Sequence, residues 1–370
     1  DIYPQSFDAG GWGVDVQFMD VMGSPYLIAH GMGNAVEDAT TTISLPRTGE
    51  WHIYARTYNW TSPWAEGRGA GGFRIGVGDE LLPNELGVEG NAWEWQYAGS
   101  VNIEKRGEQT LRLHDLTGFE GRCDAIFLTQ NKQATPPAEM SALADFRSKH
   151  NPRKTTIEEF DFVVVGGGVA GMCAAVAAAR LGVKVALIND RPLWGGTNSS
   201  ETRVHLGGHI EMEPYVNLGN MIKEFGPLRG GNAQPAENYE DDKKRLFLEA
   251  EENLTLFPSY RVYAVESNDG HIEAVRAQHI ETGEEVVFRA PIFSDCTGDG
   301  TVGYLAGAGY SMGREGRDVY GEPSAPEVGD KLTMGSSVQW YSVQTTDQSE
   351  FPVFEYGLNF NENSCERVTM

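Results

Sequence analysis

Cysteine is scarce in this chain of 370 residues. The four cysteines are far apart in the sequence: Cys123, Cys173, Cys296 and Cys365. No C-x-x-C pair occurs, which excludes a disulfide scaffold, a zinc ribbon and a redox-active dithiol. Long hydrophobic runs are lacking too, because the longest apolar stretch, residues 169–188, is interrupted by Arg180 and Lys184. No segment is therefore expected to insert into a membrane.

Positive charge is in short supply. The chain carries 29 Lys and Arg against 53 Asp and Glu, which gives a formal net charge of −24. Phosphate backbones and anionic lipid surfaces attract clustered basic residues, so this balance argues against nucleic acid and membrane partners. The excess of acidic residues is expected to form a solvated surface that favours solubility.

A common metal motif is absent as well. No H-E-x-x-H occurs, so the sequence does not support a zinc site. A serine hydrolase is not predicted either. His205 and His209 are four residues apart, but Gly207 and Gly208 between them disfavour a helix. No metal is therefore predicted. The chain begins with Asp1 rather than Met, which favours removal of a leader and a periplasmic or secreted location over a cytoplasmic one.

The length predicts at least two domains. Residues 1–130 are rich in Gly, Trp and Thr and contain short alternating runs between turn residues, which predicts an all-β sandwich of jelly-roll type. Segments 49–57 and 122–129 resemble the galactose-binding-like sandwiches that many carbohydrate-binding modules share. Its predicted loops carry several tryptophans: Trp60, Trp64, Trp93 and Trp95. These rings either stack on a glycan partner or fill the ends of the sandwich.

Three further segments are predicted after the sandwich. Residues 131–159 form a linker, which Pro136 and Pro137 stiffen and which contains a short helix over 138–149. Residues 160–309 form a second domain. Residues 310–370 begin a substrate domain, which is incomplete. Within the second domain, the pattern predicts an amphipathic helix over 239–252 and strands over 254–257 and 260–266.

The stretch 161–190 is the most informative. An apolar run over 162–165 precedes Gly166, Gly168 and Gly171 in G-x-G-x-x-G spacing, and an alanine-rich helix and a second apolar run follow. This is a complete βαβ unit of a dinucleotide-binding fold. Gly166 allows the tight turn, Gly168 clears room for a pyrophosphate, and Gly171 lets the helix pack closely on the strand. The start of the helix, at Val169 and Ala170, offers free N–H groups to the phosphates.

Two more blocks accompany this fingerprint. Residues 189–205 read NDRPLWGGTNSSETRVH, and residues 295–301 read DCTGDGT, with LAGAG at 305–309. In this order the three blocks resemble the FAD-dependent oxidoreductases with a glutathione-reductase-like flavin fold. They resemble most a bacterial subfamily that reads like DRP-x-LGG-x-x-SSE-x-RVH. The resemblance covers residues 155–370 and implies an α/β FAD/NAD(P)-binding, Rossmann-like domain with FAD as the cofactor.

The resemblance also implies the contacts to FAD. Asn189 stands where an acid usually binds the ribose hydroxyls, with Asp190 next to it, and Val262 is expected to contact adenine through its backbone. The second Gly-Gly lets the chain approach the pyrophosphate and the flavin. The implied FAD-binding residues are Gly166, Gly168, Val169, Ala170, Gly171, Asn189, Asp190, Arg191, Gly195, Gly196, Thr197, Ser199, Ser200, Val262, Thr297, Gly298 and Asp299.

Proton transfer is expected just after the second Gly-Gly. His205 is the first candidate for the base that takes a hydroxyl proton as hydride leaves, and His209 is the second. Arg203 would steady negative charge on the reduced flavin or on a carboxylate substrate. The alternative for each residue is a structural role in hydrogen bonding or ion pairing.

The family continues beyond the point where this chain stops, with a late glycine-rich helix that faces the flavin. The chain therefore resembles a fragment, a nicked half or one part of a longer protein, and a second chain that supplies the missing C-terminal part is one of the open alternatives. The predicted function is an FAD-dependent oxidoreductase that transfers hydride from a carbinol, in a sugar or a glycoside, to the flavin. Two alternatives stay open: a flavin-fold lyase with no net redox, and a carbohydrate-binding protein with a remnant flavin fold. The intact fingerprint argues against the remnant, because three glycines in that spacing are costly.

Overall fold

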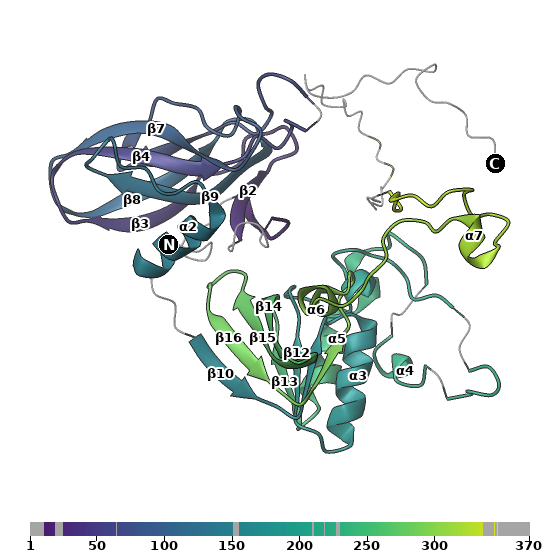
Figure 1. Ribbon diagram of the computed structural model, residues 1–370. Coiled ribbons are helices and arrows are strands. Elements are labelled where there is room, and N and C mark those ends of the chain that lie inside the picture. Colours follow the sequence, from purple (N-terminus) through teal and green to yellow (C-terminus); the bar gives the residue numbers. More distant parts are fainter. Residues whose placement is uncertain are drawn as a thin grey trace. The chain divides into compact units, whose positions relative to one another are not determined.

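The computed structural model describes residues 11–18, 25–63, 65–150, 155–208, 211–217, 219–226, 230–335, 344 and 346. The chain divides into two compact units (Figure 1). The first comprises residues 1–153, 280–283 and 345–370, and the second comprises residues 154–279 and 284–344.

Two antiparallel sheets make up the first unit. The five-stranded sheet has the order β1 (Trp12–Asp15), β2 (Tyr26–His30), β9 (Phe119–Thr129), β4 (Gly49–Thr57) and β7 (Glu94–Ile103). The four-stranded sheet has the order β3 (Ala39–Leu45), β8 (Gly107–Asp115), β5 (Phe73–Val77) and β6 (Glu80–Leu81).

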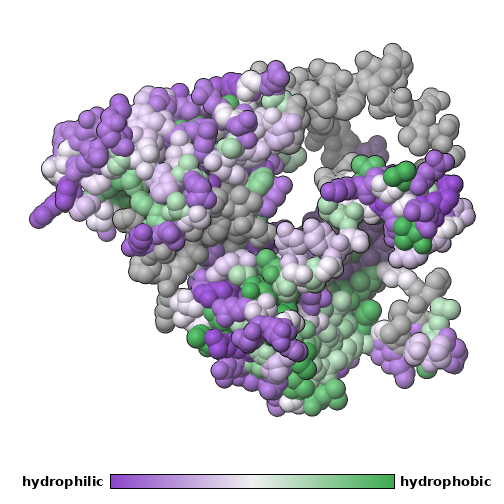
Figure 2. Space-filling view, in the orientation of Figure 1, coloured by the Kyte–Doolittle hydropathy of each residue, from purple (hydrophilic) through white to green (hydrophobic). Residues whose placement is uncertain are grey.

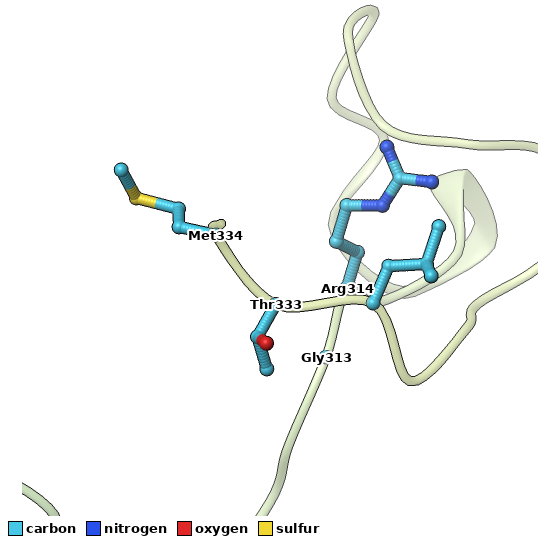
Figure 3. A pocket seen from close by; sticks show the side chains of 5 residues that line it. Gly313, Arg314, Thr333 and Met334 are labelled. Carbon is cyan, nitrogen blue, oxygen red and sulfur yellow. The ribbon is translucent and has the colours of Figure 1, made fainter. Parts of the chain in front are cut away.

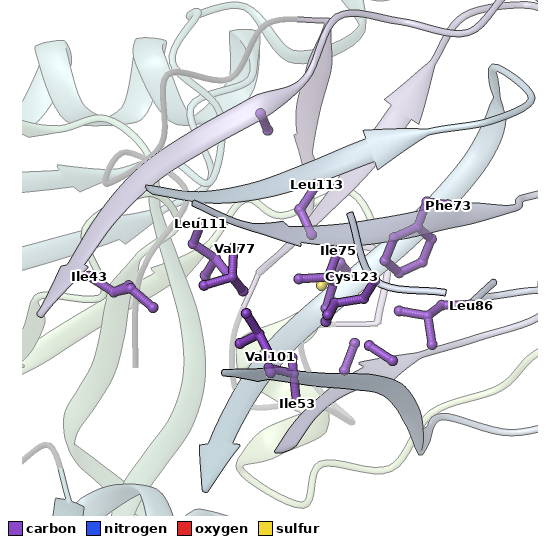
Figure 4. Close-up of a cluster of buried hydrophobic side chains, with 14 of the residues drawn as sticks. Ile43, Ile53, Phe73, Ile75, Val77, Leu86, Val101, Leu111, Leu113 and Cys123 are labelled. Atoms are coloured by element: carbon purple, nitrogen blue, oxygen red, sulfur yellow. The ribbon is translucent and has the colours of Figure 1, made fainter. Parts of the chain in front are cut away.

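The two sheets share one hydrophobic core (Figure 4). Ile53 and Val101 from the five-stranded sheet pack with Ile75, Leu111 and Leu113 from the four-stranded sheet, and all five side chains are buried. Sheets that bury their inner faces against each other form a sandwich. The jelly-roll topology and the resemblance to galactose-binding-like domains stay predictions.

Helix α2 (Met140–His150) packs on the five-stranded sheet. The buried carboxylate of Asp124 binds Arg56 of β4 and Arg147 of α2, each at 3.0 Å, and the ring of Phe146 meets Phe127 of β9. Strand β10 (Thr155–Glu159) pairs in parallel with a strand of the second unit. The predicted linker 131–159 therefore contains two elements with tertiary partners of their own, because each contributes to a neighbouring sheet or core.

Two four-stranded sheets form the second unit. The parallel sheet has the order β13 (Leu254–Phe257), β12 (Val185–Ile188), β11 (Phe162–Val165) and β17 (Ile292–Asp295). The other sheet has the order β10, β16 (Glu285–Arg289), β15 (His271–His279) and β14 (Tyr260–Asn268). Strand β11, helix α3 (Val169–Arg180) and strand β12 form the predicted βαβ unit, which the structure confirms.

The second unit has three layers (Figure 1). Successive side chains of a strand point to opposite faces, and β11 shows the consequence. Val163 and Val165 lie in a core with Phe288 of the other sheet, whereas Val164 packs with Met172 of α3. Helix α5 (Asp241–Glu249) contributes Phe247 and Leu248 to the same core as α3. The parallel sheet is therefore buried on both faces, as parallel sheets require.

Short elements complete the second unit: η2 (Gly196–Asn198), α4 (Ile222–Phe225), η3 (Ala236–Tyr239), α6 (Thr301–Leu305) and α7 (Arg317–Tyr320). Across the described ranges, no helix has the length and apolar character that crossing a bilayer requires. Figure 2 shows hydrophilic residues over most of the visible face of the first unit, as the excess of acidic residues predicts.

Candidate functional site

Three loops meet at the carboxyl ends of the parallel strands. One begins at Gly166 after β11, one at Asn189 after β12, and one at Cys296 after β17. The strands are in register, with Val165 opposite Ile188 on one side and Asp295 on the other. Open α/β sheets bind ligands at this edge. The fold therefore brings together the three sequence blocks that the resemblance assigned to FAD.

The fingerprint glycines serve two different purposes. Gly166 has φ of +106°, and a Cβ there would overlap the backbone of Cys296. A Cβ at Gly171 would overlap the carbonyl oxygen of Gly166. Gly168 has an ordinary φ of −66°, and a Cβ there would meet no atom within 4 Å. Glycine at 168 is therefore not needed by the chain itself, and the open space beside it is a cradle that fits a pyrophosphate.

Helix α3 starts at this open side. Gly168 is its N-cap and offers no side chain to the first N–H groups, and the first turn holds no acidic residue. Uncapped N–H groups and the positive end of the helix dipole attract phosphate. Val169 and Ala170 lie in this first turn, and their contacts with the cofactor stay a prediction.

The second Gly-Gly turn lies against the first loop. Gly195 pairs with Gly168 in an isolated parallel bridge, and its N–H donates to the Gly167 carbonyl at 2.8 Å. Gly195 and Gly196 have φ of +112° and +58°, values that favour glycine. A Cβ at Gly196 would lie 3.1 Å from the Cα of Gly168. The two glycine-rich turns thus form one continuous backbone surface.

Residues after the Gly-Gly turn bond mainly to their own loop. The buried hydroxyl of Ser199 donates to the Gly196 carbonyl at 2.8 Å, and the Thr197 carbonyl accepts the N–H of Val204 at 3.0 Å. The N–H of Ser200 donates to the Asp241 carboxylate at 3.2 Å. Contacts from Thr197, Ser199 and Ser200 to FAD stay predictions.

Asn189 has a structural role that the sequence did not predict. Its amide oxygen accepts the N–H of Gly167 at 3.0 Å, and its amide nitrogen donates to the carbonyls of Arg191 and Leu193 at 2.9 and 2.8 Å. Both N–H groups are used inside the chain, so one lone pair of the oxygen is left for a ribose hydroxyl. An acid could donate neither bond, which explains an amide here. The Asp190 carboxylate is 45% exposed and lies 3.6 Å from Arg261, and its contact with the ribose stays a prediction.

The third block closes the site from β17. The Asp295 carboxylate accepts the hydroxyl of Thr297 at 2.6 Å, and the Thr297 hydroxyl accepts the N–H of Thr301 at 2.8 Å. These bonds fix the turn that carries Gly298 and Asp299, which are both exposed. A Cβ at Gly298 would meet nothing within 4 Å, so this turn also presents open backbone.

Val262 lies on β14, at the end of its sheet. Its side chain is buried in the core between the two sheets, and helix α6 packs against the same strand. Any contact from Val262 to a ligand therefore comes from its backbone, which is the role that the resemblance implied.

His205 is oriented by Asn232. The Asn232 side-chain oxygen accepts the backbone N–H of His205 at 3.0 Å and lies 2.6 Å from its Nδ1. A backbone N–H only donates, so the Asn232 atom is the oxygen and Nδ1 carries a proton. This tautomer leaves the lone pair on Nε2, which is the atom a general base uses. His205 is exposed, and a Cβ at Gly207 would lie 3.3 Å from Nε2.

Arg203 has a left-handed backbone with φ of +60°. Its Nε donates to the Ser200 carbonyl at 2.9 Å, and its own carbonyl accepts the Tyr239 hydroxyl at 2.6 Å. Its proposed electrostatic role toward a flavin or a substrate stays a prediction. His209, the second predicted base, lies outside the described residues. In the described part of the chain, no three His, Cys, Asp or Glu side chains gather as metal ligands.

The sequence did not point to Asn232, Tyr239 and Lys244. Their side chains form hydrogen bonds to the backbone of the loop that follows Gly195 and Gly196. The ammonium of Lys244 donates to the Asn198 carbonyl at 2.5 Å, and its side chain is fully buried. A signal was present, because Lys244, Phe247 and Leu248 stand at i, i+3 and i+4 on α5 and share its buried face.

The tryptophans of the first unit contact other parts of that unit. The Trp60 indole donates to the Phe119 carbonyl at 2.9 Å, and the Trp95 indole donates to the Pro137 carbonyl at 3.2 Å. Trp93 stacks on Tyr58 with ring centroids 5.6 Å apart. These three rings pack within the unit, whereas Trp64 lies outside the described residues. Glycan binding by the sandwich stays a prediction.

A pocket of about 530 Å³ lies in the second unit (Figure 3). It is lined by Gly313, Arg314, Leu332, Thr333 and Met334. Met334 is 96% exposed, so this pocket is an open hollow at the surface. None of its lining residues belongs to the three loops, and it is assigned no role.

Known proteins match part of the chain. A glycerol-3-phosphate dehydrogenase of Mycobacterium leprae is 49% identical over 72 residues, which cover 20% of this chain and 11% of the relative. An aerobic glycerol-3-phosphate dehydrogenase of Staphylococcus aureus strain USA300 is 36% identical over 67 residues, which cover 18% of this chain and 12% of the relative. The chain thus matches about a tenth of the length of these curated relatives.

Solved structures match about two fifths of the chain at low overall similarity. An E. coli quinol fumarate reductase matches with a TM-score of 0.29 and 17% identity, over 39% of this chain and 33% of that one. An L-proline dehydrogenase from P. horikoshii matches with a TM-score of 0.26 and 17% identity, over 40% and 24%.

The family comparison covers a larger share. The profile described as FAD dependent oxidoreductase matches residues 161–366, which is more than half of the chain and includes all three loops. FAD is the cofactor that this match assigns, and the open cradle at Gly168 agrees with it. The chain therefore belongs to the FAD dependent oxidoreductase family.

Proposed function

We propose that this chain binds FAD along the three loops and takes part in oxidising a carbinol substrate. The observation that carries the proposal is the open cradle at Gly168, where the fingerprint turn and the Gly-Gly turn form one backbone surface. It lies at the edge of a parallel sheet where ligands bind. The family match to residues 161–366 supports the same cofactor.

Each loop has a distinct part of FAD to hold. The N–H groups of Val169 and Ala170 would hold the pyrophosphate beside Gly168, and the Asp190 carboxylate would bind the ribose hydroxyls. The backbone of Val262 would contact adenine. The open backbone at Gly196 and Gly298 would hold the rest of the cofactor.

FAD, when bound, supplies the hydride acceptor. The chain's own part is to place a base beside the substrate hydroxyl. As the carbinol carbon loses its hydrogen with the bonding electron pair, Nε2 of His205 accepts the hydroxyl proton and a carbonyl forms. Asn232 keeps Nδ1 protonated, so the lone pair of Nε2 is available at the start of the reaction.

The substrate class is a sugar, a glycoside or a related polyol. Two relatives carry names that refer to glycerol 3-phosphate, which is itself a carbinol. The predicted sandwich in residues 1–130 supports a carbohydrate more weakly, because its described tryptophans Trp60, Trp93 and Trp95 contact their own unit.

The test is flavin reduction without oxygen. The protein is reconstituted with FAD and mixed with sugars, polyols and polyol phosphates, and loss of the oxidised-flavin absorbance is followed. We expect reduction by at least one compound, with His205→Ala binding FAD normally but reduced about 100-fold more slowly. His271→Ala, an exposed histidine on β15, is the matched control. Equal rates in His205→Ala and wild type would refute the base, and product formation with unchanged flavin absorbance would favour a lyase.

A further inference from the structure

A buried lysine lies directly beneath the second Gly-Gly turn. Lys244 of α5 has 0% exposure, and its ammonium donates to the carbonyls of Asn198 and Tyr239. A Cβ at Gly195 would lie 3.0 Å from the Cδ and Cε of Lys244, so the lysine stem packs against the turn. Burying an ammonium costs free energy unless it is paired and hydrogen-bonded. Here the hydrogen bonds satisfy the ammonium and hold the turn in place.

One of the two carbonyls that Lys244 binds, that of Asn198, belongs to the loop that carries the candidate base. The Asn198 side chain donates to the Val204 carbonyl at 2.8 Å, directly before His205. The hydroxyl of Tyr239 donates to the Arg203 carbonyl at 2.6 Å. One buried group thus ties the Gly-Gly turn, the short helix η3 and the segment before His205 into a single network.

Charge around Lys244 is balanced. The Asp241 carboxylate lies 3.8 Å from its ammonium and also accepts the N–H of Ser200. Burial lowers the pKa of Lys244, and the carboxylates of Asp241 and Glu240 oppose that shift. The ion pair therefore anchors α5 to the loop at two points, Asn198 and Ser200.

We propose that Lys244 is a positioning residue for the FAD site: its buried hydrogen bonds hold the loop 195–204 in the shape that receives the cofactor. It rests on the proposed function, since the loop is assigned to FAD there. Lys244 touches neither cofactor nor substrate in this role. It acts through Gly195, whose backbone pairs with Gly168 at the cradle.

The experiment compares Lys244→Met with wild type in the full chain. Met keeps most of the stem and removes the donors. We expect the dissociation constant for FAD to rise at least about tenfold, because the charge-assisted hydrogen bonds to Asn198 in the loop and to Tyr239 behind it are lost. The visible circular dichroism of bound FAD should change. Amide hydrogen exchange in peptides covering 195–204 should become faster in the apoprotein, a readout that needs no cofactor.

Two further variants make the test decisive. Lys243→Met, at the neighbouring and partly exposed lysine, should leave FAD affinity, dichroism and exchange unchanged. Lys244→Gln, which is one bond shorter and uncharged, should fall between Lys244→Met and wild type, and it replaces Lys244→Met if that variant does not fold. Wild-type affinity and exchange in whichever Lys244 variant folds would overturn the positioning role alone. A wild-type protein that binds no FAD would overturn this role together with the proposed function.

Discussion

At the scale of single residues, several polar side chains around the site form hydrogen bonds to the protein backbone. Asn189 uses both of its N–H groups to shape the loop after β12, and Lys244 uses its ammonium to hold the next turn. Such partners depend on which loops meet in three dimensions. The sequence identified Asn189 as a departure from the usual acid, but it could not show which carbonyls the amide would bind.

A pH-sensitive pair lies in the first unit, where His30 is 3.7 Å from Glu120. The neighbouring Glu120 carboxylate raises the pKa of His30 above 6.5, and the His30 ring lowers the pKa of Glu120 below 4.5. The contribution of His30 to stability is complete below pH 6.5 and is lost as the pH rises through the raised pKa of His30. The contribution of Glu120 to stability is complete above pH 4.5 and is lost as the pH falls through the lowered pKa of Glu120.

The ion pair between His30 and Glu120 therefore stabilises the fold fully between pH 4.5 and pH 6.5. Both side chains are more than a third exposed, so solvent keeps the effect small. We expect an NMR titration of the His30 ring to give a pKa above the ordinary value, and Glu120→Gln to lower it. Glu108→Gln, an exposed acid on β8, serves as the control. An unchanged His30 titration in Glu120→Gln would show that the two groups do not interact.

At the scale of elements, strand β11, helix α3 and strand β12 were predictable from the sequence almost to the residue. Their apolar runs, the alanine-rich segment and the punctuating glycines all indicate one βαβ unit, which agrees with the register of β11 on β12. Helix α2 and strand β10 were predicted as parts of a linker. Their pattern is weak, and the partners that stabilise them, Asp124 for α2 and β16 for β10, are remote in the sequence.

The turn between β11 and α3 offers a test that separates folding from binding. Gly168→Ala should fold with wild-type thermal stability, because the new methyl group meets no protein atom within 4 Å. It should lose FAD affinity about tenfold or more, since the methyl group occupies the space beside the pyrophosphate. Fluorescence quenching of FAD on titration measures this.

Gly335→Ala is the matched control, because its methyl group also meets no atom within 4 Å and it lies outside the three loops. It should bind FAD as wild type does. Gly171→Ala should instead destabilise the fold, because its methyl group overlaps the Gly166 carbonyl. Wild-type FAD affinity in Gly168→Ala would place the pyrophosphate elsewhere.

At the scale of the whole molecule, each of the two compact units has a hydrophobic core of its own. We therefore expect calorimetry to resolve two unfolding transitions. FAD at 100 times its dissociation constant should stabilise only the unit that binds it, by about 2.7 kcal/mol. In the Gly168→Ala variant, the same unfolding transition should not shift when FAD is added at that concentration. A single transition, or an FAD response shared by both, would show that the two units unfold together.

The contacts of the fingerprint glycines also have an evolutionary consequence. Gly166 and Gly171 interlock through backbone contacts, so a descendant that had lost its cofactor would keep both to remain folded. Only Gly168 is released from selection when FAD is no longer bound. Retention of Gly166 and Gly171 therefore carries no information about a working cofactor site, whereas retention of Gly168 supports one. Among homologous proteins, replacement of glycine at the position of Gly168 would indicate that the flavin has been lost.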